Sequence, residues 1–90
     1  MESKIEIIQI NISGEDKPGM TSSLTDILAR YDAFILDIGQ ANIHQSLTLG
    51  ILFMTTSDKS GAILKELLFK ASELGVMIRF TPISEERYND

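Results

Sequence analysis

A chain of 90 residues has enough apolar surface for one core and too little to divide between two. Its composition, with 43% hydrophobic residues and only two prolines, is typical of a folded domain and not of a disordered chain. Thirteen acidic against eight basic residues leave a net charge of −5, which argues against binding to nucleic acid or to anionic membranes.

The first part of the chain predicts a strand followed by a helix. Ile5–Ile12 is rich in β-branched residues and ends at Ser13-Gly14, a loop signal. After residues 15–19, apolar residues recur at the spacing of one helical face: Leu24, Ile27, Leu28 and Tyr31. The polar residues at positions 21–23, Thr-Ser-Ser, are available as caps for the start of this helix.

The middle of the chain predicts a β-hairpin. Ala33–Ile43 and Leu47–Thr56 are extended, apolar-rich runs, and the three residues 44–46 between them suit only an antiparallel turn. The longest apolar stretch, Leu49–Met54, is far too short to cross a bilayer, and no apolar signal segment follows Met1. We therefore expect a cytoplasmic protein that does not bind membranes.

A second helix and a fourth strand complete the pattern. The helix opens at Ser57-Asp58 and ends at Gly75, a natural left-handed C-cap. Val76–Ile83 is the predicted fourth strand, in which Pro82 suits a sheet edge or a strand end. One face of the helix is apolar: Ile63, Leu64, Leu67, Leu68, Ala71 and Leu74.

These elements predict an α+β fold, a ferredoxin-like βαββαβ sandwich in which two helices cover one face of a four-stranded antiparallel sheet. The second strand of the hairpin is nevertheless apolar on both sides. Leu47, Leu49, Ile51 and Phe53 lie on one side, and Leu52 and Met54 on the other. A two-layer monomer would show polar side chains on its free face, so we expect that face to carry a partner surface.

The sequence offers no set of residues suited to catalysis or metal binding. Cysteine is absent, and His44 is the single histidine, whereas a metal site needs several converging ligands. The acids at positions 66, 73, 85 and 86 fall on helix surfaces or in the tail, and none forms an acid–base pair. We therefore expect no catalytic residue, metal or cofactor in this segment.

Three other classes of protein share this strand order, but the sequence lacks the residues that each of them requires. RNA-binding domains add basic residues to the aromatic side chains of the central strands, but residues 33–56 contain no lysine or arginine. Residues 14–19 contain neither the arginine of an acylphosphatase-like enzyme nor the cysteines of a ferredoxin-like metal carrier.

The loop Gly14-Glu15-Asp16-Lys17-Pro18-Gly19-Met20-Thr21 is the strongest local signal. It leads from a strand into a helix, whose first amides lack intrahelical partners and attract an anion. Pro18 would stiffen this approach, and Gly19 would let a ligand carboxylate come close to the backbone. The alternative is structural: Pro18-Gly19 forms an ordinary turn and Thr21 an ordinary helix cap.

The motif Gly14-x-Asp16-x-Pro18-Gly19, followed by methionine, resembles the first loop of ACT domains, βαββαβ modules that bind amino acids and regulate metabolic enzymes. The similarity extends through Ile35-x-Asp37-Ile38-x-Gln40 and the second helix–strand pair. The segment 38–50, above all Leu47-Thr48-Leu49-Gly50, resembles the amino-terminal ACT domain of bacterial phosphoserine phosphatases.

This resemblance implies a ligand pocket lined by Asp16, Pro18, Gly19, Met20 and Thr21, with weaker assignments for Asp37 and Gln40, which have opposite strand parity. It also implies that residues 1–84 are one ACT domain and residues 85–90 the start of a linker. A haloacid-dehalogenase-type phosphatase domain, with its magnesium ion, would lie beyond Asp90. Its Asp-x-Asp nucleophile motif is absent from these 90 residues.

The expected function is regulation of serine biosynthesis by binding of an amino acid, L-serine, at an interface with another ACT domain, in a homodimer or a tandem pair. Two alternatives stay open. The segment could be a dimerisation module without a ligand, or an ACT-type regulator that acts on a protein partner, as in glycine-cleavage regulators.

Overall fold

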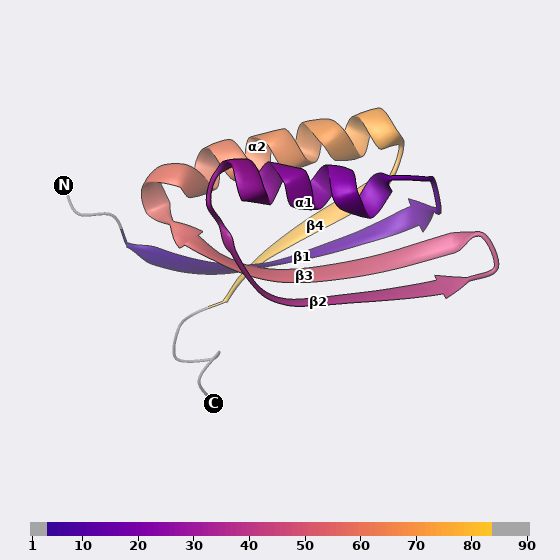
Figure 1. Cartoon of the computed structure of the whole chain (residues 1–90), viewed down its shortest axis with the longest axis horizontal. Coiled ribbons are helices and arrows are strands. Elements are labelled where there is room, and N and C mark those ends of the chain that lie inside the picture. The colour runs from indigo at the N-terminus through magenta and orange to yellow at the C-terminus, as the bar shows by residue number, and fades with distance from the viewer. Residues whose placement is uncertain (1–3, 84–90) are drawn as a thin grey trace.

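A computed structural model of the protein describes residues 4–83. Four strands form one sheet in the order β2-β3-β1-β4, with every neighbouring pair antiparallel, and both helices lie on the same face of it (Figure 1). The predicted ferredoxin-like βαββαβ fold is therefore confirmed. The expected linker at residues 85–90 lies outside the described residues. The elements are β1 (Ile5–Glu15), α1 (Met20–Arg30), β2 (Phe34–Ile43), β3 (Ser46–Thr56), α2 (Ser57–Leu74) and β4 (Met77–Ile83).

The core lies between the helices and the sheet. Ile8 pairs with Phe53 and Ile10 with Ile51, so alternate residues of β1 and β3 face the helices. The predicted inner side of β3 is confirmed, since its four residues are all at most 1% exposed. The main cluster is completed by Ile12, Met20, Leu24, Ile27, Leu28, Leu47, Leu49, Ile63 and Leu67.

The first strand is longer than predicted, since β1 continues past Ile12 to Glu15. The reason is pairing: Ser13, Gly14 and Glu15 lie opposite residues 48, 47 and 46 of β3, which extends the ladder. Gly14 is thus a strand residue. A Cβ atom at this position would lie 2.7 Å from Val76 Cγ1, so glycine is needed for the close approach between the end of β1 and the segment after α2.

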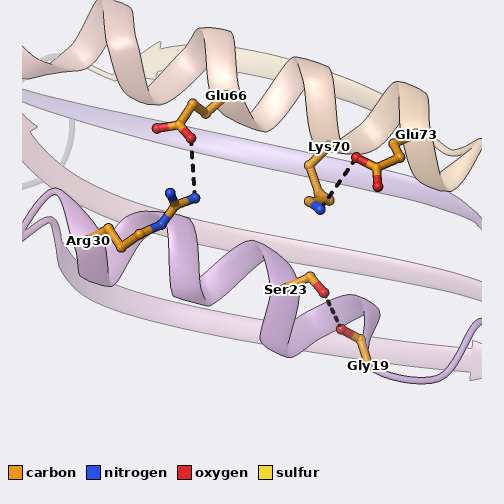
Figure 2. A network of polar contacts seen from close by, with 6 residues as sticks. All are labelled: Gly19, Ser23, Arg30, Glu66, Lys70 and Glu73. Atoms are coloured by element: carbon orange, nitrogen blue, oxygen red, sulfur yellow. Dashed lines mark hydrogen bonds and ion pairs between the residues drawn. The ribbon is translucent and has the colours of Figure 1, made fainter.

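The helix ends agree with the sequence prediction at α2 and differ at α1. Gly75 caps α2 in the left-handed conformation (φ 74°), as predicted. At α1 the N-cap is Gly19 (φ 75°), and no side chain caps the helix, so the prediction for residues 21–23 is wrong. The hydroxyls of Ser23 (2.8 Å; Figure 2) and Ser22 (3.1 Å) instead donate to the Gly19 carbonyl.

The two helices are linked by an ion pair. Arg30 Nη2 lies 3.2 Å from Glu66 Oε1 (Figure 2), and a hydrogen bond to Glu66 raises the pKa of Tyr31.

Leu68 was expected on the apolar face of α2, but its side chain is 55% exposed, because it lies at the edge of the stripe that packs on the sheet.

The outer strands of the sheet are β2 and β4. Pro82 lies in β4, an edge strand, as predicted. β2 contains a bulge at Leu36, between the pairs made by Ile35 and Asp37. Within residues 4–83, neither helix has the length and apolar character needed to cross a membrane.

Candidate functional site

The loop between β1 and α1 borders an open depression of about 510 Å³. The loop supplies residues 16–19, the first turns of α1 supply polar side chains, and β2 supplies Gln40. The full lining is Asp16, Lys17, Pro18, Gly19, Met20, Thr21, Ser22, Thr25 and Gln40. No group of three or more His, Asp or Glu side chains in the described part of the chain could hold a metal ion.

The start of α1 presents backbone donors to this depression. The Met20 N–H donates to the Lys17 carbonyl (3.3 Å), and the Ser23 N–H to the Gly19 carbonyl (3.0 Å). Between them, the N–H groups of Thr21 and Ser22 have no acceptor among residues 4–83. Two free amides at the positive end of a helix favour an anionic group such as a carboxylate.

A chain of side-chain hydrogen bonds joins the loop, α1 and β2. Thr21 Oγ1 donates to Gln40 Oε1 (3.0 Å), and Gln40 Nε2 donates to Asn42 Oδ1 (2.9 Å). Asn42 Nδ2 then donates to Asp16 Oδ2 (2.8 Å). The network fixes the Asp16 carboxylate at one side of the depression and leaves its second oxygen available to a ligand.

The loop is also tied to its other neighbours. The Asp16 N–H donates to the Gln45 carbonyl in the β2–β3 turn (2.9 Å). On the opposite side, Lys17 Nζ donates to the Leu74 carbonyl (2.6 Å), at the negative end of the α2 dipole. The loop is therefore held on both sides, which lowers the ordering entropy that ligand binding would cost.

Six of the seven predicted ligand residues come together at this depression, and Asp37 does not. Asp37 pairs with Leu52, on the sheet face away from the helices, whereas Gln40 pairs with Leu49 on the helix side. Their opposite parity is therefore confirmed, and only Gln40 reaches the loop. Met20 borders the depression but is 1% exposed, because its side chain belongs to the core.

Sequence reasoning missed four residues of the site, Lys17, Ser22, Thr25 and Asn42. Asn42 could have been found from its spacing, because residues two apart on a strand share a face and Gln40 had been proposed. Lys17 carried no such signal, since its partner Leu74 is distant in sequence and meets it only in the folded chain.

The family model of the ACT domain matches residues 6–81. The chain belongs to the ACT domain family. This ACT domain resembles phosphoserine phosphatase SerB2 of Mycobacterium tuberculosis, with 38% identity over 52 residues, or 58% of the chain. It spans only 12% of the length of that relative, which is a much longer protein.

Solved structures of the same fold include a protein assigned as a glycine cleavage system transcriptional repressor, with a TM-score of 0.84 at 16% identity. That match covers 89% of this chain and 47% of the repressor. An ACT domain protein from Streptococcus pneumoniae matches with a TM-score of 0.72 at 20% identity, over 86% of this chain and 89% of that one. At these identities the likeness shows the fold alone.

Proposed function

We propose that this regulatory ACT domain binds a free amino acid, L-serine, in the depression at the start of α1. The observation that carries the proposal is that two unused helix amides and the Asp16 carboxylate border the same open depression. An amino acid has a carboxylate and an ammonium group a few ångströms apart. Each group would therefore find a partner of opposite polarity.

In this arrangement the ligand carboxylate accepts hydrogen bonds from the Thr21 and Ser22 N–H groups. Its ammonium group donates to the free oxygen of Asp16, a charge-assisted bond. The left-handed Gly19 has no side chain to obstruct the carboxylate, and a Cβ there would meet only Ser22 Oγ, at 3.9 Å. The hydroxyl of serine suits the polar side chains of Thr21 and Gln40, which border the same space.

The similarity to a phosphoserine phosphatase supports a role in serine biosynthesis, with this domain regulating a phosphatase domain elsewhere in a longer protein. That haloacid-dehalogenase-type domain would supply the magnesium ion and the chemistry. Regulation requires that serine bind two assembly states with different affinity. A second ACT domain that completes the site in only one state would meet this requirement, because Gln40 and Asn42 lie on the edge strand β2.

Calorimetric titration with L-serine, glycine and other amino acids tests the proposal, on this chain and on the proposed longer protein. We expect binding of L-serine, and a loss of affinity of at least about tenfold for Asp16→Asn, since a charged hydrogen bond disappears. Asp32→Asn, beyond the opposite end of α1, is the matched control and should bind normally.

The alternatives predict other outcomes. A dimerisation module without a ligand binds no amino acid in either form of the protein. The likeness to the glycine cleavage repressor suggests the other alternative, a regulator that acts on a protein partner. Such a domain would bind that partner whether or not serine is present. Normal serine binding by folded Asp16→Asn and Gly19→Ala variants would rule out this loop as the site.

A further inference from the structure

The sheet face away from the helices has a regular pattern that a monomer does not explain. Its side chains form four rows that run across the strands in the order β2, β3, β1, β4. The rows are Phe34-Met54-Ile7-Ile83, Asp37-Leu52-Gln9-Thr81, Gly39-Gly50-Asn11-Arg79 and Ala41-Thr48-Ser13-Met77. The first row is entirely apolar, and Phe34 in it is 63% exposed.

Two glycines in this face lie directly opposite one another. Gly39 pairs with Gly50, in the interior of β2 and β3. Neither has a positive φ, and a Cβ at Gly39 would meet nothing within 4 Å, so the monomer does not require glycine there. Glycine weakens a strand, and its presence marks a place where another group approaches the backbone closely.

We infer that the open sheet face pairs with the same face of a second copy of this chain, about a two-fold axis parallel to the strands between β1 and β3. This axis lays β2 of each copy over β4 of the other, and β3 over β1. Each row of one copy faces the same row of the other copy, with the order of the strands reversed. The inference does not rest on amino-acid binding, because the depression lies on the helix side of the sheet.

Size complementarity favours this pairing. Arg79 of one copy lies over Gly39 of the other, where no side chain occupies the space, and Asn11 lies over Gly50. In the next row, Met77, which is 73% exposed, lies over the small side chain of Ala41. Large residues therefore meet small ones in these two rows of the β2–β4 overlap, which suits packing at a spacing of about 10 Å between sheets.

Charge complementarity points to the same axis. Asp37 and Gly39 are neighbours on one face of β2, so an arginine that enters above Gly39 reaches the Asp37 carboxylate. Arg79 has no ion-pair partner within residues 4–83, where the ion pairs are Arg30–Glu66 and Lys70–Glu73. The pairing would give two symmetric Asp37–Arg79 contacts between the copies.

The apolar row meets itself in this arrangement. Phe34 lies over Ile83, and Met54 over Ile7. Ile7 is only 5% exposed in the single chain, so the apolar surface that association newly buries comes mainly from Phe34, Met54 and Ile83. A two-fold axis across the strands would instead place this row over the row of Ala41, Thr48, Ser13 and Met77, which sets Met54 and Ile7 against two hydroxyl groups. It would also bring each Asp37 near the other, which costs free energy through repulsion of like charges.

Sedimentation equilibrium of the 90-residue chain, without amino acid, tests the inference. We expect a dimer at micromolar concentration. Gly39→Val should abolish it while thermal unfolding of the monomer is unchanged or raised, since valine favours strands and meets no clash. Gly61→Ala, at a position on α2 where a Cβ also meets nothing, is the control that should stay dimeric.

Charge reversal provides a test that is independent of size. Asp37→Arg and Arg79→Asp should each weaken dimerisation at least about tenfold, and the double variant should restore it, because the exchanged charges meet again. A monomeric wild-type chain would overturn the inference. So would a dimer that is insensitive to both Gly39→Val and the single charge reversals, since its contact would lie elsewhere.

Discussion

The two helices begin in opposite ways, although each follows a strand. Residues 16–19 separate β1 from α1, whereas β3 ends at Thr56 and α2 begins at Ser57. The start of α2 is also covered by Lys4, whose N–H donates to Ser57 Oγ (3.0 Å) and whose carbonyl accepts from the Ser57 N–H (2.7 Å). Within residues 4–83, the start of α1 therefore combines a loop, unused amides and room for a ligand, whereas α2 follows β3 without a loop.

The largest expected effect on stability comes from Gly14, at the end of β1 next to the junction with α1. Gly14→Val places side-chain atoms against Val76, where even a Cβ would lie 2.7 Å from Cγ1. We expect a loss of about 1–3 kcal/mol in the free energy of unfolding, measured with urea. Gly61→Ala is the control and should be neutral or stabilising by up to about 1 kcal/mol. Equal stability of both variants would show that β1 and Val76 can move apart.

A matched pair of glycines separates strain from ligand binding. Gly19 and Gly75 both have φ near 75°, so alanine at either position should cost about 1–2 kcal/mol in unfolding experiments. Serine titration should distinguish them, because only Gly19 borders the depression. Equal loss of serine affinity in the two variants would mean that general destabilisation, and not the site, governs binding.

A smaller effect is expected from one hydrogen bond at each junction. Thr21→Val removes the bond to Gln40, and Ser57→Ala removes the bond from Lys4. Each substitution should lower the free energy of unfolding by no more than about 0.5–1.5 kcal/mol, because both bonds are exposed to solvent. Thermal unfolding measures this loss. Serine affinity should fall only for Thr21→Val, and a fall for Ser57→Ala would contradict the assignment of separate roles.

The smallest effect is expected between the helices. Glu66→Gln removes the exposed ion pair with Arg30 and should cost less than about 1 kcal/mol. Because the hydrogen bond to Glu66 raises the pKa of Tyr31, the substitution should lower that pKa towards 10.0. Absorbance of the tyrosinate measures it, in a Tyr88→Phe background so that one tyrosine is observed. An unchanged pKa would show that Glu66 does not contact the phenol.

The sequence anticipated the elements whose signals are local. Apolar periodicity identified both helices, Gly75 marked the end of α2, and the short turn implied the hairpin. The loop motif located the candidate site, since Pro-Gly followed by a helix start is itself a local feature. Six of the seven proposed site residues therefore border one depression.

The main error in an element's bounds arose where a distant part of the chain sets the local structure. β1 continues through Gly14 because β3 pairs with it, and periodicity within residues 5–15 does not contain that information. The caps proposed at positions 21–23 failed for a different reason: α1 begins at Met20 with Gly19 as its N-cap, so these residues lie inside the helix. The opposite strand parity of Asp37 and Gln40, in contrast, was predicted from the sequence, and the structure identifies Gln40 as the one on the helix side.

The sequence by itself determined the fold class, the loop and the apolar character of both sides of β3, because each follows from the order and spacing of neighbouring residues. Only the tertiary structure decided which side chains share a surface. Strand register joins Gly39 to Gly50 and places Arg79 in the same row, and chain folding brings Lys17 to Leu74. Such contacts depend on pairing between residues that are far apart in sequence, so no local pattern can encode them.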